Sequence, residues 1–223
     1  MFEVSKTWKS VFAGAYAGVL VMHNVANPAS HVNLEGQREA LEGQLRSRFA
    51  GQARSDLETL PRLQAYGAYY KRFKKTYHVQ LQLESIVFKE KSIPSVAALV
   101  EAMFMAEIKN MLLTAGHDLD VLQLPVILDV SQGDESYTLL RGQSQLLKAG
   151  DMMMMDGGGI ISSIVYGPDQ RTQIQASTQN VMFTVYAPSG ITEQAVIEHL
   201  QDLEQYVRLV APDAQVEMLE VFG

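Results

Sequence analysis

The chain has 223 residues, of which 47% are hydrophobic and 19% charged, a composition typical of a globular protein with an apolar core. Its formal net charge of −7 argues against binding of nucleic acid through the charge of the whole protein. Binding through a local basic patch is still possible. The absence of cysteine excludes disulfides, zinc–thiolate sites and cysteine nucleophiles.

The N-terminal part predicts a cytoplasmic protein without a membrane segment. No basic patch followed by an apolar stretch and a cleavage site marks a signal peptide. The apolar run Val11–Met22 contains Gly14 and Gly18 and is shorter than the roughly 20 residues that a membrane-spanning helix needs. This run is therefore expected to form a buried strand or strand pair.

Two helical segments are expected next. Leu34–Phe49 places leucines and a phenylalanine on one side of a helix, with charged residues between them. A second run begins near Ser55 and continues to Tyr66, and Pro61 is expected to kink or delay it.

The only basic cluster of the chain lies in Tyr69–His78, where cations alternate with aromatic rings. In one interpretation the cations bind RNA phosphates and the rings stack on bases. In the other, the segment is a helix C-terminus whose cations complement the helix dipole while its rings belong to the core. The candidate RNA-binding residues are Lys71, Arg72, Lys74 and Lys75.

Val79 to Glu84 alternates apolar and polar residues, which predicts a half-buried strand. On such a strand Gln80, Gln82 and Glu84 would share one face. The two glutamines could offer amide groups to a ligand, beside His78, or could simply form a solvated face.

Ser95 to about Leu113 is apolar nearly all round, so a buried helix is expected, with proline at its start and Gly116 after its end. Polar groups on a buried helix must be paired or functional. The polar exceptions on this helix are Glu101, Glu107, Lys109 and Asn110.

The second half of the chain predicts mainly strands. Gln123–Val130 and Ser136–Leu140 are expected to pair across a turn at Gly133–Glu135. Further strands are expected at Asp151–Asp156, Ile160–Tyr166, Asn180–Tyr186 and Val216–Val221, with an amphipathic helix starting at Thr192. The fold class is α+β in one unit, open to division into an N-terminal subdomain (1–68), a core (69–190) and a C-terminal helix–strand pair (191–223).

Familiar catalytic and cofactor motifs are absent: there is no Gly-x-Ser-x-Gly elbow, no zinc helix, no dinucleotide fingerprint and no Walker loop. His117, Asp118 and Asp169 are the candidate catalytic residues. Adjacent residues on one turn rarely converge on one ion, and an aspartate there often closes the turn itself, so no metal and no cofactor are predicted.

Tyr77–Thr178 resembles the B3/4 domain of the phenylalanyl-tRNA synthetase beta chain and the free-standing proteins built around it. The likeness rests on an ordered set of features rather than on one motif. These are Ile93-Pro94, Asp118-Leu119-Asp120, Gly133-Asp134-Glu135 before a tyrosine strand, Gly150-Asp151 leading to Asp156, and Thr178-Gln179-Asn180-Val181.

The resemblance implies a three-layer fold with an unusual sheet sandwich and flanking helices. It also implies a pocket that receives the 3′ end of charged tRNA and hydrolyses a wrongly attached tyrosine, with a water positioned by polar groups. No ATP-binding aminoacylation domain is found in these residues, so a complete aminoacyl-tRNA synthetase is not expected.

The chain departs from the family at the pocket. Aligned on Asp118-Leu119-Asp120, the family's pocket histidine falls at about Ala115 and its helix asparagine at about Phe104. The family's late acidic residue falls near Asp169, and Thr178 matches its threonine.

Three functions stay open: a tRNA-end binder or trans-acting deacylase, a binding module for an amino acid or similar metabolite, and a hydrolase of a free ester or amide that uses water. The predicted ligand-binding residues are His78, Gln80, Gln82, Glu101, Asn110 and Thr178. The oligomeric state is not predicted.

Overall fold

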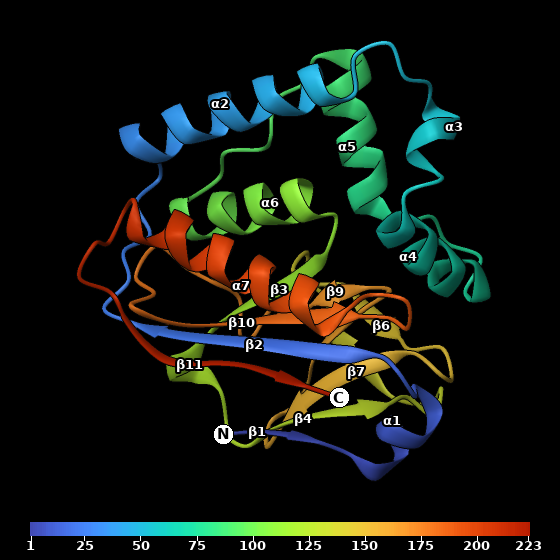
Figure 1. The fold of residues 1–223 in the computed structure, drawn as a ribbon. Coiled ribbons are helices and arrows are strands. Elements are labelled where there is room, and N and C mark those ends of the chain that lie inside the picture. Colours follow the sequence, from blue (N-terminus) through green and yellow to red (C-terminus); the bar gives the residue numbers. More distant parts are fainter.

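The computed structural model describes all residues from Met1 to Gly223, in α-helices, two larger sheets and a small hairpin (Figure 1). The α-helices are α1 (Lys6–Val11), α2 (Val32–Arg48), α3 (Arg54–Leu57), α4 (Pro61–Arg72), α5 (His78–Lys89), α6 (Ala98–Asn110) and α7 (Glu193–Arg208). The strands are β1 (Phe2–Val4), β2 (Tyr16–His23), β3 (Leu113–Asp118), β4 (Val126–Val130), β5 (Ser136–Thr138), β6 (Ser144–Leu146), β7 (Met152–Asp156), β8 (Gly159–Ser163), β9 (Gly167–Pro168), β10 (Asn180–Ala187) and β11 (Gln215–Phe222).

The four-stranded sheet has the order β11-β2-β10-β3, and all three of its pairings are antiparallel. The five-stranded sheet has the order β1-β4-β7-β8-β9, with β1 parallel to β4 and the other neighbours antiparallel. Figure 1 shows α6 and α7 on one side of the four-stranded sheet and the five-stranded sheet on the other. This arrangement confirms the expected α+β fold with layered sheets and flanking helices.

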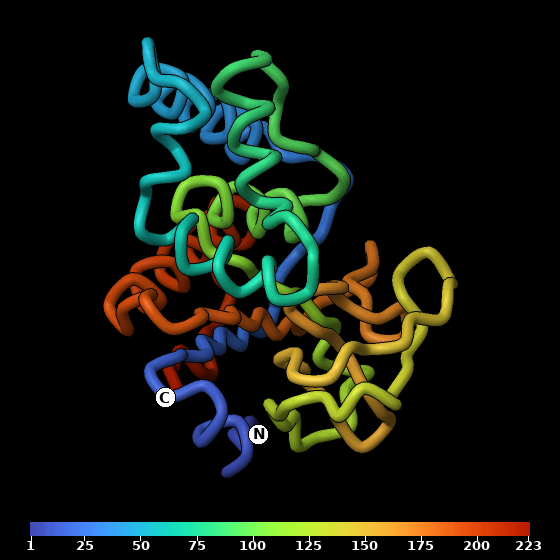
Figure 2. Tube along the Cα trace, turned by 90° about the vertical axis from the view of Figure 1, so that its right-hand side faces the viewer, coloured from blue at the N-terminus to red at the C-terminus, as the bar shows by residue number.

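One continuous core of 57 buried residues joins the sheets and helices. Strands from the N-terminal, central and C-terminal parts of the chain all contribute to the four-stranded sheet. The two chain ends also meet, since the rings of Phe2 and Phe222 lie 5.0 Å apart. Figure 2 shows α2, α3 and α5 gathered at the end of the molecule opposite the five-stranded sheet.

The expected strand over Val79–Glu84 is wrong, because these residues belong to α5. Val79, Leu83 and Ile86 are buried at helical spacing, whereas Leu81, which the alternation placed with them, is exposed. Gln80, Gln82 and Glu84 therefore do not share a strand face.

Three other expectations about secondary structure need correction. The buried helix ends at Asn110 rather than near Leu113, and Leu113–Asp118 is strand β3, which pairs with β10. Ser136–Thr138 pairs with β6, while β4 pairs with β1 and β7. The run that begins near Ser55 is divided into α3 and α4, and Pro61 delays the helix by starting α4 rather than kinking it.

None of these helices combines the length and the apolar composition that crossing a membrane requires.

Gly18 allows α7 to pack directly on β2. A Cβ atom built at Gly18 would lie 2.5 Å from Cγ1 of Val196 and 3.1 Å from Cδ1 of Leu200. The side chains of Val196 and Leu200 are fully buried, so neither can move aside without disturbing the core.

Gly18→Val is expected to lower the free energy of unfolding by about 1–3 kcal/mol because it overpacks the contact between α7 and β2. The measurement is urea denaturation. Gly43→Ala is the control, since that position on α2 has no neighbour within 4 Å; it should leave stability unchanged or raise it by about 0.5–1 kcal/mol. Equal stability of Gly18→Val and the native chain would contradict this packing.

Candidate functional site

A cavity of about 300 Å³ lies between α6, β3 and the segment from Ser163 to Ile174. This size is at the lower end of the range for ligand pockets, which suits a small ligand or one group of a larger one. Its walls are mostly apolar and include Val96, Val100, Met103, Phe104, Leu113, Ala115, Leu140, Pro168 and Ile174. The polar groups that reach it belong to His78, Glu107, Thr114, Ser163, Gln173 and Tyr186.

The sequence of α6 supplies one wall of the cavity. Val100, Met103, Phe104 and Glu107 recur at the spacing of a single helix face. Asn27 fixes the start of this helix: its side-chain oxygen accepts from Leu99 N, and its amide group donates to Gln175 O. The same asparagine therefore holds α6 against the loop that forms the opposite side.

Three of the four polar exceptions on α6 have charged partners outside the cavity. Glu101 lies 3.0 Å from an Arg38 nitrogen, and both Lys109 and Asn110 contact the Asp202 carboxylate, at 2.7 and 2.8 Å. Glu101 and Asn110, predicted to bind a ligand, therefore connect helices and do not line the cavity.

Glu107, the fourth exception, has no cationic partner. Its Oε1 atom accepts a hydrogen bond of 2.7 Å from Thr114 N, and no protein group donates to its other oxygen. The residue is only 2% exposed and lines the cavity. Burial raises the pKa of Glu107 to about 8, although the bond from Thr114 N acts in the opposite direction.

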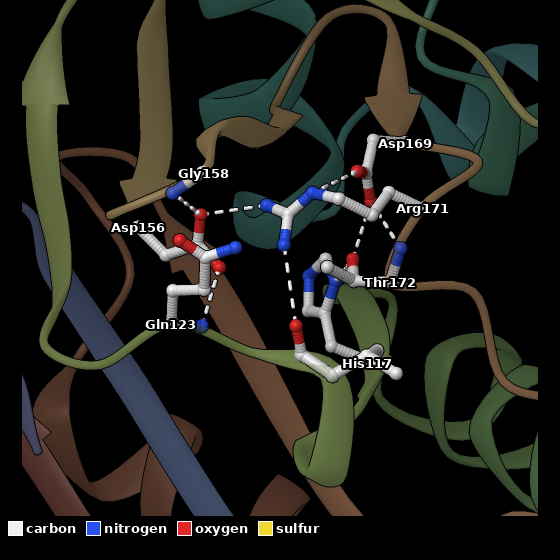
Figure 3. A network of polar contacts seen from close by, with 8 residues as sticks. His117, Gln123, Asp156, Gly158, Asp169, Arg171 and Thr172 are labelled. Carbon is white, nitrogen blue, oxygen red and sulfur yellow. Dashed lines mark hydrogen bonds and ion pairs between the residues drawn. The ribbon is translucent and has the colours of Figure 1, made fainter.

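His117 and Asp169, predicted as catalytic residues, meet in a buried network beside the cavity (Figure 3). The Thr172 hydroxyl donates to Asp169 and lies 2.7 Å from His117 Nδ1. Because that hydroxyl has a single hydrogen, Nδ1 must be the donor to Thr172. His117 Nε2 is buried without a partner, and burial lowers the pKa of His117 to about 3, so the ring is neutral.

Arg171 links this network to Asp156. Its guanidinium lies 2.6 Å from Asp156 Oδ1 and 3.8 Å from Asp169 Oδ2, and it donates to Val121 O at 3.2 Å. Asp156 also accepts from the N–H groups of Gln123 and Gly158 (Figure 3). Burial alone would raise the pKa of Asp156, but these donors and the arginine lower it overall.

The network does not line the cavity, although Asp169 and Arg171 border a separate polar hollow between β5 and β8.

Asp118 belongs neither to this network nor to the cavity: its carboxylate accepts from Thr178 Oγ1 at 2.6 Å and from Asp120 N at 3.1 Å. This pairing gives Asp118 and Thr178 a turn-closing role. No cluster of three or more His, Asp or Glu side chains could hold a metal ion.

Among the remaining predicted ligand-binding residues, only His78 reaches the cavity. Gln80 is buried on α5 and donates to Glu84 at 2.9 Å. Gln82 borders a shallower hollow between α5 and the segment Lys91–Pro94. Glu107, the most distinctive polar group of the cavity, was detectable in the sequence only as a charge on an otherwise apolar helix.

The basic cluster occupies the C-terminal end of α4 and the turn to α5. Lys71, Arg72, Lys74 and Lys75 are all exposed. The rings of Tyr69, Tyr70, Phe73 and Tyr77 are at most 4% exposed, so the base-stacking interpretation is wrong and the rings belong to the core.

One cation of the cluster lies close to the cavity. Lys75 Nζ is 5.6 Å from the centre of the Tyr166 ring, and the next residue along the chain, Gly167, lines the cavity. His78, three residues after Lys75, lines it as well. Lys75 therefore lies beside the cavity, whereas the Arg72 guanidinium lies over the rings of Phe12 and Tyr69.

The high pKa of Glu107 predicts a pH-dependent effect of Glu107→Gln on stability. The folded chain holds the Glu107 proton more tightly than the unfolded chain. The native chain therefore loses stability as pH rises from about 4.5 to 8, because the unfolded chain releases this proton first. The free energy of unfolding of the variant minus that of the native chain should therefore be larger at pH 8 than at pH 5, by at least about 1 kcal/mol. Urea denaturation at both pH values measures this difference.

Asp151→Asn provides a comparison with a lower pH window, because burial raises the pKa of Asp151 only to about 6. Its stability difference from the native chain should change mainly between pH 4 and 6. A difference for Glu107→Gln that is the same at pH 5 and pH 8 would show that Glu107 is not shielded from water.

Comparison with known proteins supports the layered fold. The sequence profile of the B3/4 domain matches residues 62–220. No curated protein matches the chain in sequence. An N-terminal fragment of the phenylalanyl-tRNA synthetase beta-subunit from Pyrococcus horikoshii is similar in structure, with a TM-score of 0.53 over 100% of this chain. At 9% identity this similarity concerns the fold, and the chain spans about half (54%) of that fragment.

The family profile covers α4 to β11, which includes every wall of the cavity and the basic cluster beside it. The chain belongs to the B3/4 domain family.

Proposed function

We propose that this chain binds the aminoacyl 3′ end of tRNA, with the aminoacyl group in the cavity beside α6 and the phosphates on the basic cluster. The observation that carries the proposal is the position of an apolar cavity close to Lys75, which belongs to the only basic cluster of an acidic chain. The solved relative is part of a tRNA synthetase subunit, which makes charged tRNA the first ligand to test.

The cavity suits a single amino-acid side chain rather than a nucleobase stack. Its volume of about 300 Å³ and its aliphatic walls favour a compact apolar group. The buried tyrosines of α4 present no face to a base, so recognition of RNA has to rely on phosphate contacts and on the aminoacyl group.

The electrostatics predict weak and salt-sensitive RNA binding. Lys71, Lys74 and Lys75 can reach phosphates, whereas the Arg72 guanidinium lies over the rings of Phe12 and Tyr69 at 5.6 and 5.3 Å. The overall charge of −7 opposes a polyanion at longer range. Discrimination between charged and uncharged tRNA would therefore come from the cavity.

Hydrolysis of a mischarged tRNA in trans is the catalytic extension of this proposal. One hydroxyl–imidazole pair adjoins the cavity, since Thr114 Oγ1 lies 2.7 Å from Nε2 of the fully buried His199. In this proposal the attacking group is instead a water held by polar lining groups. His117, Asp118 and Asp169 do not reach the cavity, and in this proposal they are positioning residues that support β3 and the loop 169–178.

A metabolite-binding module is the second candidate function, and the apolar, partly enclosed cavity in an acidic protein favours it. Such a module would bind small ligands without any contribution from the basic cluster. Preferential binding of charged tRNA separates the two functions.

Lys74→Ala combined with Lys75→Ala is expected to weaken binding of aminoacyl-tRNA and to reduce the slope of log affinity against log salt by about 2. Filter binding at several salt concentrations measures both quantities. The matched control is Lys89→Ala with Lys91→Ala, which removes the same charge at the far end of α5. Equal effects of the two double variants would remove the basic cluster from the proposed interface.

Val100→Trp should fill the cavity and abolish the preference for aminoacylated over uncharged tRNA while leaving the salt dependence intact. Val100 lies at the half-exposed rim of the cavity, so a larger side chain can enter without disturbing the core. Val32→Trp, at a surface position 76% exposed, is the control. A preference that survives in Val100→Trp would place the aminoacyl group elsewhere.

A deacylation assay with correctly charged and mischarged tRNA tests the catalytic extension. Hydrolysis that falls at least tenfold in His117→Ala and in Asp169→Ala, with tRNA affinity retained, would support a trans-editing role. Binding without hydrolysis in the native chain would leave a tRNA-end binder.

A further inference from the structure

Buried carboxylates in this protein almost always have an arginine partner. Seven acidic residues are buried, and five of them lie within 4.0 Å of an arginine nitrogen. These five are Glu42, Glu84, Glu101, Asp156 and Asp169. The two exceptions are Glu107 and Asp151, and each has to compensate for its removal from water in another way.

Asp151 is sealed inside the protein. It accepts a hydrogen bond of 2.8 Å from the Tyr69 hydroxyl, and it lines none of the cavities described above. No ligand can therefore reach it. Its role is to hold α4 against the start of β7, where Met152 N donates to the same hydroxyl.

Glu107 differs from Asp151 because it faces a cavity. One of its oxygens is held by Thr114 N, and the other has no protein donor. No lysine or arginine is among the residues that line the cavity. The other titratable side chains there are His78, whose pKa burial lowers, and Tyr186, whose pKa burial raises, so both are neutral at pH 7 and the protein supplies no counter-charge. The surrounding walls, such as Val100, Phe104 and Ile174, are apolar. A partner for the carboxyl group therefore has to come from a ligand.

We infer that Glu107 forms an ion pair with a primary ammonium group of the ligand, so that the cavity takes compounds that combine an ammonium group with an apolar body. This inference rests on the proposed function in one respect, since the aminoacyl group of charged tRNA carries an α-ammonium group. It goes beyond that function by naming the group that is recognised and the residue that recognises it.

The protonation of Glu107 makes the inference measurable. With its pKa raised to about 8 by burial, the carboxyl group of the empty cavity is mainly protonated at pH 7. An ammonium group that enters the cavity favours the carboxylate, so the carboxyl proton is released to solvent as the ion pair forms. Binding should therefore release up to one proton per ligand.

The first experiment uses alaninamide, leucinamide and phenylalaninamide, each compared with its N-acetyl derivative, which lacks the ammonium group. Isothermal titration at pH 7 in two buffers with different ionisation enthalpies gives the affinity and the number of protons released. At least one amide is expected to bind the native chain tenfold or more tightly than its N-acetyl derivative, with proton release.

Glu107→Gln should lose both the tenfold preference and the proton release, because an amide side chain keeps the bond from Thr114 N but cannot ionise. Asp151→Asn is the control, since it removes the other buried carboxylate without an arginine partner and should retain both effects. If no amide is preferred over its N-acetyl derivative in the native chain, the inference is overturned, whatever the variants do.

A second experiment separates this inference from the proposed function by comparing uncharged, aminoacylated and N-acetyl-aminoacylated tRNA in filter binding. A preference for charged tRNA that N-acetylation leaves unchanged would keep the proposed function and overturn the inference. Amides bound through Glu107 together with equal binding of charged and uncharged tRNA would uphold the inference and reject the tRNA function.

Discussion

Hydrogen bonds from four buried tyrosines of α4 and the α4–α5 turn hold the two sheets and α6 in their relative positions. The Tyr66 hydroxyl donates to Tyr186 O and accepts from Leu113 N, which fixes the adjoining ends of β10 and β3. Tyr69 contacts Asp151 and Met152 N at the start of β7, and Tyr70 donates to Ile164 O just after β8. Because they are buried, each of these main-chain groups would be costly to leave without a hydrogen-bond partner.

Tyr77 extends the same set to the reversal between α6 and β3. Its hydroxyl donates to Met111 O, and its ring stacks on that of Tyr66 at 4.2 Å. Met111 adopts a left-handed conformation with φ of +58°, which lets the chain leave the helix and enter β3 within three residues. This short reversal brings Thr114 N against the Glu107 carboxyl group, so the polar end of the cavity depends on the tyrosine contacts.

How much of the fold could be predicted from sequence depended on how many periodicities fit each segment. The runs around β2, β7, β10 and α7 were recognisable because one periodicity or one apolar stretch fits them. In α5 two periodicities compete: Val79, Leu83 and Ile86 suit a helix, while Val79, Leu81 and Leu83 suit a strand. Only the tertiary structure shows that Leu81 is exposed, so local sequence could not resolve the choice.

The candidate site was harder to predict than the fold, because burial decides what each polar residue does. His117 and Asp169, both predicted as catalytic, are connected through the Thr172 hydroxyl, but the cavity is lined by Gly116 and Gln173 rather than by either of them. In the sequence, Glu101, Glu107 and Asn110 are all polar residues on one apolar helix. Only the structure shows that Glu101 contacts Arg38 and Asn110 contacts Asp202, whereas Glu107 has no charged partner. The end of α6 at a left-handed methionine was likewise invisible, since glycine is the usual signal for that conformation.

The two positions at which the chain departs from the family pattern both line the cavity, which bears on what the cavity can do. By the resemblance, the family's pocket histidine falls at about Ala115 and its helix asparagine at about Phe104, and both residues line the cavity. If this correspondence holds, an apolar side chain stands at each position where the family has a polar one. Glu107 lies three residues after Phe104 on the same helix and lines the same cavity. An imidazole and an amide can orient a water, but a methyl group and a phenyl ring cannot. Among the polar groups that line the cavity, Glu107 is the only acidic one, and no cation of the protein is among the lining residues. A buried carboxyl group of this kind is suited to holding a cation that a ligand brings.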